Sequence, residues 1–394
     1  MTNTRKTSQS ADVIPEIGPH QFVGWFFEPH PSLGWKMRAN QQAIFHKPDI
    51  HTHVSTNRQG FRWPDFPVNK AIDKQRILIL ADSFGVAIEV EQGQTFASRL
   101  QAAFDLHSST EKEPFVEILN ASVGGYGTEQ EFLYLQENIT ALEPDLILVC
   151  FHFGDDLIEN NPELRARIHW RLVKLPRPYL VSQKFGEFIR VSDPGTEQQA
   201  NQAWMRYYDF LPHHLIKKVV PQNQLSQHSL SKRLFRKFAE RLNNRSHNRK
   251  DNTIPLDLLI YASQQDTVFE EAWQHTSALL AGCLHLANLH GARLAVVGIC
   301  TKEQIVPNYL VKRVQNAPDS SAYSFDPYYP NRRLAEILNI LDIPLIDLTP
   351  VFEKAQHAGE CLFFDHDLHW NPQGHALAAK ALFKALRQLS LDKT

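Results

Sequence analysis

Short apolar runs alternate along much of the chain with segments whose apolar residues recur at helical spacing. The predicted strands cover residues 76–81, 115–119, 145–151, 292–299 and 344–348, and the predicted helices cover residues 95–104, 129–142, 269–290, 331–341 and 374–389. Strands that are apolar on both faces and alternate with helices are typical of parallel sheets covered on both sides. The pattern therefore predicts a doubly wound α/β domain with a mainly parallel, five-stranded sheet.

Two stretches interrupt this rhythm. Residues 1–70 show little periodicity and are rich in Pro, His, Asn and Gln, which indicates an irregular N-terminal arm with short strands. Residues 161–265 are rich in proline, aromatic and basic residues and are too long for a plain loop. We interpret them as an insertion, partly helical and basic, between the two halves of the α/β domain at 71–160 and 266–394.

Composition narrows the class of protein. The 394 residues are 43% apolar and 21% charged, an ordinary balance for a globular chain. A net charge of -2 gives no overall field to attract nucleic acid or an anionic membrane. Because the apolar runs are far shorter than the ~18 residues of a membrane span and the first thirty residues are polar, we expect no transmembrane segment, no signal peptide and a cytoplasmic location.

The four cysteines are scattered and lack C-x-x-C spacing: Cys150, Cys283, Cys300 and Cys361. This distribution fits reduced, mostly buried thiols better than a disulfide framework or a zinc site.

Ser83 directly follows the first predicted strand, at the start of a helix. Ligands of open α/β sheets bind beyond the carboxyl ends of the strands, where the amides of a helix N-terminus favour an anion. Ser83 is therefore a candidate nucleophile. An ordinary helix cap explains the Asp82–Ser83 pair equally well.

A second polar cluster lies near the C-terminus, in Asp365-His366-Asp367-Leu368-His369. A histidine with nearby carboxylates can act as the base for a serine, with the acid orienting the imidazole. A surface turn and a metal site are the alternatives, and because no further cluster matches a metal site we expect none.

Two more loops follow predicted strands. The loop from Asn120 to Thr128 contains three glycines, which allow backbone N–H groups to point at a ligand. The loop that begins His152-Phe153-Gly154-Asp155-Asp156 is polar. Since the carboxyl ends of parallel strands meet at one edge of a sheet, we expect all of these loops to surround one site.

The order of these pieces resembles the SGNH, or GDSL-type, hydrolase family. Asp82-Ser83 resembles the family's first block, Asn120–Gly127 the second, Gly154-Asp155-Asp156 the third, and Asp367-Leu368-His369 the fifth. The resemblance implies a flavodoxin-like SGNH fold with Ser83 as nucleophile and His369 as base. It implies Asp367 as the acid, with Asp365 as second choice, and an oxyanion hole formed by Ser83, Gly125 and the third-block residue Asp155.

Asp155 departs from the family pattern, in which an asparagine donates an N–H to the oxyanion. An ionised aspartate only accepts hydrogen bonds. Three functions follow: a serine ester hydrolase acting on an acyl ester, for which O-acetyl glycans are a family-level guess; a carbohydrate O-acyltransferase with the same triad; or a catalytically inactive binding protein. A nucleophile elbow of the α/β-hydrolase type fits poorly, because the acid lies beside the histidine.

No cofactor is implied. Residues 232–250 combine eight basic residues with an apolar helical face. This pattern is typical of a helix that contacts an anionic surface weakly, or of a solvated helix packed through its apolar face.

Overall fold

The structure is a computed structural model that describes residues 14–67, 69–111, 115–167, 177, 179–184, 187–191, 204, 210–219 and 254–391. Its centre is a five-stranded sheet in the order β12-β11-β8-β6-β7, and all neighbouring strands are parallel. The strands are β6 (Lys74–Leu80), β7 (Phe115–Asn120), β8 (Leu146–His152), β11 (Arg293–Ile299) and β12 (Leu345–Asp347). The predicted doubly wound α/β fold is confirmed, with each strand at its expected place.

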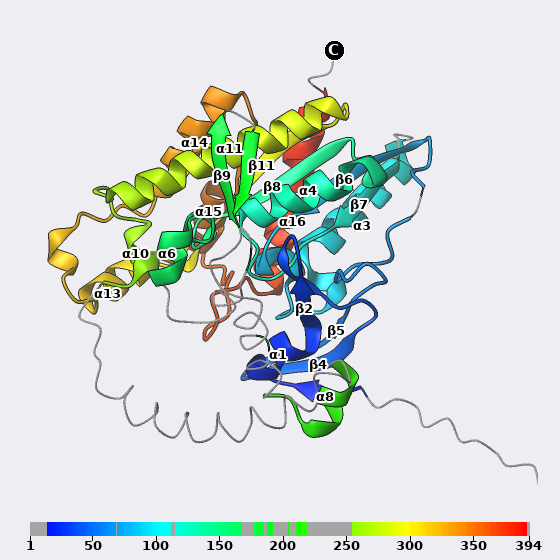
Figure 1. Ribbon diagram of the computed structural model, residues 1–394, viewed down its shortest axis with the longest axis horizontal. Coiled ribbons are helices and arrows are strands. Elements are labelled where there is room, and N and C mark those ends of the chain that lie inside the picture. The colour runs from blue at the N-terminus through cyan, green and yellow to red at the C-terminus, as the bar shows by residue number, and fades with distance from the viewer. Residues whose placement is uncertain are drawn as a thin grey trace, which may run out of the picture.

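Helices cover both faces of this sheet (Figure 1). One face carries α4 (Thr128–Leu142), α11 (Thr267–Leu289) and α14 (Tyr329–Leu341), and the other carries α3 (Phe96–Glu111), α15 (Thr349–His357) and α16 (Pro372–Leu391). Alternate strand residues serve the two cores, so that Leu78 packs toward α4 and α11 while Ile79 packs toward α3 and α16. This arrangement explains why the strands are apolar on both faces.

The strand order reverses at β6, because β7 lies on one side of it and β8 on the other. In open parallel sheets, a crevice forms at such a point outside the carboxyl ends of the strands. The loops that follow β6, β7, β8 and β11 all reach this edge. Short helices begin there: α2 (Ser83–Val86), α5 (Asp156–Glu159) and α12 (Lys302–Ile305).

The N-terminal segment is more regular than the expected arm. It contains α1 (Pro19–Phe26) and the strands β1 (Glu16–Ile17), β2 (Phe27–His30), β3 (Gly34–Met37), β4 (Gln42–Lys47) and β5 (Ile50–Ser55). Strands β4 and β5 form an antiparallel hairpin beside β1, and β2 pairs with β3. Trp35 and Phe45 are fully buried in the same core as α4 and α11. The segment therefore packs on the α/β domain, and Figure 1 shows its blue strands gathered below the sheet.

The expected insertion is described only in parts. These are α6 (Pro162–Arg167), the antiparallel pair β9 (Tyr179–Lys184) and β10 (Glu187–Val191), α8 (His213–Val219) and α10 (Leu256–Leu259). After it, α13 (Tyr309–Gln315) connects α12 to α14. The basic stretch at residues 232–250 lies outside the described residues.

Among the described helices, none combines the length and apolar character that a membrane crossing requires. The four cysteines are free thiols, three of them buried and Cys361 exposed.

Candidate active site

Ser83 is the first residue of α2, immediately beyond β6. The Asp82 carboxylate caps this short helix by accepting the N–H of Phe84 at 2.9 Å. Gly85 lets the helix approach the loop after β7, because a Cβ at this position would collide with the Ser122 side chain. The close approach fixes the direction in which the Ser83 side chain leaves the sheet.

The Ser83 hydroxyl meets a histidine from the far end of the sequence. Its Oγ lies 2.8 Å from the Nε2 of His369, and the Nδ1 of His369 lies 2.5 Å from the Oδ1 of Asp367. The same Asp367 oxygen accepts the backbone N–H of His369 at 2.9 Å. The structure thus brings Ser83, His369 and Asp367 into one hydrogen-bonded chain, with the carboxylate two residues before the imidazole.

Lys302 holds the turn that carries Asp367. Its ammonium donates to the backbone carbonyls of Phe364, Asp365 and Asp367, at 2.5, 3.1 and 2.8 Å. The hydrogen bonds found for Asp365 are therefore at its backbone, and the carboxylate that contacts His369 belongs to Asp367. Burial outweighs the nearby carboxylates and lowers the pKa of Lys302.

A second carboxylate and a lysine adjoin the triad. The Lys47 ammonium, at the end of β4, lies 2.6 Å from the Oδ2 of Asp367 and 3.1 Å from the Oε1 of Glu89. The same Glu89 oxygen lies 3.4 Å from the Nδ1 of His369. The imidazole therefore faces two carboxylates, with one ammonium shared between them.

These contacts set the protonation states of His369 and Asp367. Burial works against the charged imidazole, but Glu89 and Asp367 outweigh it and raise the pKa of His369 above 6.5. Burial is likewise outweighed at Asp367, where His369 and Lys47 hold the pKa well below its usual range. Asp367 is therefore ionised across the ordinary pH range.

Arg62 holds the loop that presents Glu89. Its buried guanidinium donates to the backbone carbonyls of Val86, Ala87 and Val90. Ala87 ends α2 in the left-handed conformation, with φ of 51°. Arg62 thus fixes the backbone between Ser83 and Glu89.

The glycine loop lies between β7 and α4. Gly125 adopts φ of 76°, a left-handed conformation that favours glycine. The Gly124 carbonyl accepts the indole N–H of the buried Trp35 at 3.1 Å, and Asn120 Nδ2 donates to the Gly85 carbonyl at 3.0 Å. These bonds join the loop to α2 on one side and to the N-terminal segment on the other.

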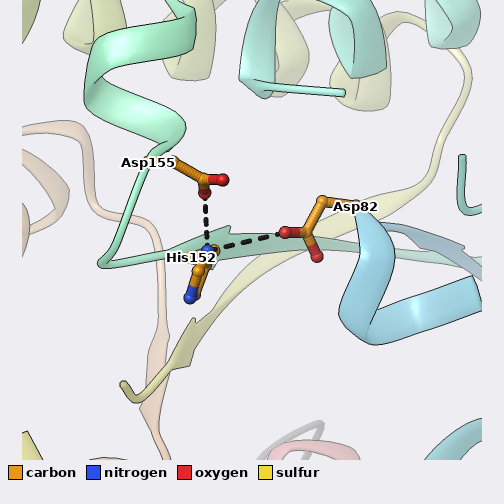
Figure 2. A group of neighbouring side chains, drawn as sticks. All are labelled: Asp82, His152 and Asp155. Carbon is orange, nitrogen blue, oxygen red and sulfur yellow. Dashed lines mark hydrogen bonds and ion pairs between the residues drawn. The ribbon is translucent and has the colours of Figure 1, made fainter. Parts of the chain in front are cut away.

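The loop after β8 brings Asp155 to a histidine. Figure 2 shows His152 between Asp155 and Asp82, with both carboxylates directed at its Nδ1. The distances are 2.6 Å to Asp155 and 3.5 Å to Asp82. Burial opposes the charge, but the two aspartates outweigh it and raise the pKa of His152 to about 9. At neutral pH this residue is an imidazolium.

A phenyl ring separates the two histidines of the site. The Phe84 ring centroid lies 4.6 Å from that of His152 and 5.0 Å from that of His369. The fully buried Trp370 packs on the same ring at 5.0 Å. Both imidazoles therefore pack on Phe84, but they face different pairs of carboxylates.

Two groups within the described residues have donor atoms close enough to share a cation. They are Asp82, His152 and Asp155, and Glu89, Asp367 and His369, each with ligand atoms within 4.8 Å of one another. In the second group, Lys47 already binds Asp367 and Ser83 already lies within hydrogen-bond distance of His369. An ammonium 2.6 Å from Asp367 would repel a cation there.

Three residues of this site did not emerge from the sequence: Lys47, Glu89 and Lys302. Lys302 carries a usable signal, because Thr301-Lys302 directly follows the strand of residues 292–299 and so reaches the same sheet edge as Ser83. Lys47 and Glu89 lie in polar segments with no pattern that distinguishes them from surface charges.

The comparisons with known proteins concern fold and family. Residues 260–394 match the model of a family described as SGNH hydrolase-like domain, acetyltransferase AlgX. No curated protein sequence matches the chain.

Among solved structures, the acetyl xylan esterase AlAXEase is 9% identical with a TM-score of 0.39, covering 79% of this chain and 99% of its own. A variant of the acetyl xylan esterase Axe2 of Geobacillus stearothermophilus is 9% identical with a TM-score of 0.39, covering 79% of this chain and 93% of its own. The esterase EstA of Pseudoalteromonas sp. is 13% identical with a TM-score of 0.37, covering 80% and 98%. These are distant likenesses.

The family match over residues 260–394 includes the last two strands of the sheet and the turn with Asp367 and His369. The first three strands complete a parallel sheet in the 2-1-3-4-5 order of flavodoxin-like folds. The family match and the strand order together indicate an SGNH hydrolase-like, flavodoxin-like fold.

Proposed function

We propose that this protein is a serine hydrolase of acyl esters, with Ser83 as nucleophile, His369 as base and Asp367 as its partner. The observation that carries the proposal is the continuous chain from Ser83 Oγ through His369 to Asp367, at 2.8 and 2.5 Å. A serine hydroxyl is a weak nucleophile unless a base lies within hydrogen-bond reach and is itself oriented by a third group. All three groups meet at one edge of the sheet.

The reaction proceeds in two transfers. The Ser83 Oγ attacks the ester carbonyl carbon while its proton passes to the Nε2 of His369, and the carbonyl oxygen becomes an oxyanion. The carbon–oxygen bond to the leaving alcohol then breaks as His369 returns the proton to that alcohol. A water molecule attacks the resulting acyl-serine and gives a proton to His369. The bond between the acyl carbon and the Ser83 Oγ then breaks as His369 returns that proton to the Oγ, and the acid is released.

Backbone N–H groups supply the oxyanion hole. We assign this role to the N–H of Ser83, at the N-terminus of α2, and to the N–H of Gly125. Donors that point to the position of the developing charge contribute strongly because they need no reorganisation. The Asp155 carboxylate is paired with His152 at 2.6 Å, so the imidazolium offsets a negative charge that would oppose the oxyanion.

A second candidate is transfer of the acyl group to a hydroxyl of a carbohydrate. The match to a family described by an acetyltransferase favours it, and it also favours acetyl as the group transferred. The same residues serve, because only the acceptor of the acyl-serine changes. The geometry of Ser83, His369 and Asp367 therefore supports both reactions.

Labelling and turnover test the proposal together. A fluorophosphonate probe should label the wild-type protein at Ser83, and p-nitrophenyl acetate should be hydrolysed by the wild type but about 10³-fold more slowly by Ser83→Ala. Ser32→Ala is the matched control, since Ser32 is a buried serine that hydrogen-bonds His30 in the N-terminal segment. Absence of labelling and of turnover across a panel of acyl esters would favour the inactive binding protein.

Acceptor competition separates the two reactions. With p-nitrophenyl acetate as donor, a hydrolase should release free acetate even when an oligosaccharide is added as acceptor. Mass spectrometry that finds acetylated sugar in place of acetate would identify the transferase.

A further inference from the structure

Lys47 comes from the N-terminal segment and contacts the triad of Ser83, His369 and Asp367. No sequence pattern predicts a lysine at this position, and the proposed reaction does not require one. Its ammonium binds the outer oxygen of Asp367 at 2.6 Å, and the inner oxygen of that carboxylate binds His369. Lys47 is half-buried, and 320 positions separate it from Asp367. A contact over this separation exists only because the β4–β5 hairpin packs beside the active-site turn.

The contact between Lys47 and Asp367 also includes a buried carboxylate, that of Glu89. Its side chain is 3% exposed, and its Oε1 lies 3.1 Å from Lys47 and 3.4 Å from His369. Its Oε2 is buried and has no hydrogen-bond partner among the described residues. A buried carboxylate beside an imidazole favours the imidazolium, which cannot accept the proton of Ser83. A cation between the two carboxylates counters this effect.

We propose that Lys47 is a positioning residue, which fixes Asp367 against His369 and balances the charge of Glu89 so that the imidazole can act as a base. The proposal rests on the proposed serine ester hydrolysis. Arg62 completes the arrangement, because it donates to the backbone carbonyls of Val86 and Val90 and so holds the loop that places Glu89 near Lys47 and His369. Arg62, Lys47 on the β4–β5 hairpin and the buried Glu89 thus act on one imidazole.

The charges around His369 come from several elements. Asp367 lies on its own turn, Glu89 on the loop after α2, Lys47 on β4 and Asp82 at the end of β6. His375 on α16 also interacts electrostatically with the ring, while Lys302 on α12 and Arg62 act through the carboxylates. Of these groups, Lys47 and Glu89 form the pair that should move the titration of His369 in opposite directions without forming part of the triad.

The test compares pH profiles of kcat/KM for p-nitrophenyl acetate. In Lys47→Met, the acidic limb should move to higher pH by about one unit, since the imidazolium loses a neighbour of like charge. In Glu89→Gln it should move to lower pH. Lys47→Arg should restore the wild-type limb at least in part, because it keeps the charge. Lys36→Met is the control, because Lys36 pairs with Glu28 in the same segment away from the triad and should leave the profile unchanged.

A second measurement does not depend on turnover. The imidazole of His369 can be titrated by NMR in the Ser83→Ala background, with and without Lys47→Met, and the pKa should be higher in the double variant. An inactive wild type would contradict the ester hydrolase but leave this shift intact. An unchanged NMR titration, or limbs that move in the same direction in Lys47→Met and Glu89→Gln, would overturn the role of Lys47.

Discussion

His152 Nδ1 and Asp155 Oδ1 lie 2.6 Å apart where β8 ends, so the aspartate that the sequence resemblance matches to an oxyanion asparagine is engaged by an imidazolium. The pair carries no net charge when both members are ionised. Under the proposed hydrolysis, this relationship gives a physical reason why an aspartate is tolerated beside an oxyanion that develops negative charge.

Asp155→Asn tests the consequence for catalysis. The amide can donate an N–H to the oxyanion, and the loss of the carboxylate also removes a negative charge from the site. We expect turnover of p-nitrophenyl acetate at pH 7 to rise by about tenfold, less than the ~10²-fold contributed by a well-placed oxyanion donor. A fall in turnover with an unchanged unfolding midpoint would mean that the carboxylate itself is required.

The same pair predicts a dependence of stability on pH. The pKa of His152 is about 9 in the folded chain and near 6.5 when the residue is unpaired, so the folded state holds the proton more tightly. The stabilisation is fully present below pH 6.5 and is lost as the pH rises through 9. Urea unfolding of wild type and His152→Gln at about pH 6, 8 and 10 should show a difference that shrinks with pH. A constant difference would contradict the imidazolium.

Asp367→Asn and Asp365→Asn should have unequal effects. The amide introduced by the first change would keep one polar contact but lose the charge that stabilises the His369 imidazolium formed during the reaction. We expect kcat to fall by roughly 10⁴-fold for Asp367→Asn, as for the corresponding change in other triads, and by less than about threefold for Asp365→Asn. Steady-state kinetics at saturating ester decide this, and the reverse order would assign the acid to Asp365.

Lys302→Met should disturb the turn that carries both Asp367 and His369. Three backbone carbonyls lose a charged donor, and a small displacement of reacting groups is costly to the rate. We expect kcat to fall by about 10- to 100-fold with the binding of ester largely retained. Lys312→Met, at an exposed lysine of the nearby α13, is the control and should behave as wild type. Equal kcat values for the two variants would show that Lys302 does not position the reacting groups.

The sheet could be predicted from the sequence because strands that are buried on both faces appear as runs of consecutive apolar residues. Residues 77–80 and 146–151 are apolar at successive positions, and they belong to the central strands β6 and β8. The helix α1 is harder to predict, since its apolar residues form a short run interrupted by Gly24 and follow Pro19 in a segment with several other prolines. Trp25 and Phe26 are buried because they pack on the core of the domain, and this packing cannot be read from the local sequence.

The candidate site divides in the same way. Ser83, Gly125 and Asp155 follow strands, so their common edge could be inferred from the parallel sheet. Lys47 and Glu89 belong to segments whose approach depends on how the N-terminal hairpin docks, which no local pattern encodes. Asp367 and Asp365 could not be separated by spacing alone, because the choice depends on how Lys302 folds the turn.

The 286 positions between Ser83 and His369 also affect when activity can arise. During synthesis Ser83 is made long before His369, which lies on a turn anchored by the buried Trp370 and by helix α16. Contacts between such distant segments form late, after the entropy of closing the intervening chain has been overcome. Under the proposed hydrolysis, a growing polypeptide therefore carries an inert Ser83, and reactivity toward esters begins only when the turn with His369 has docked beside it.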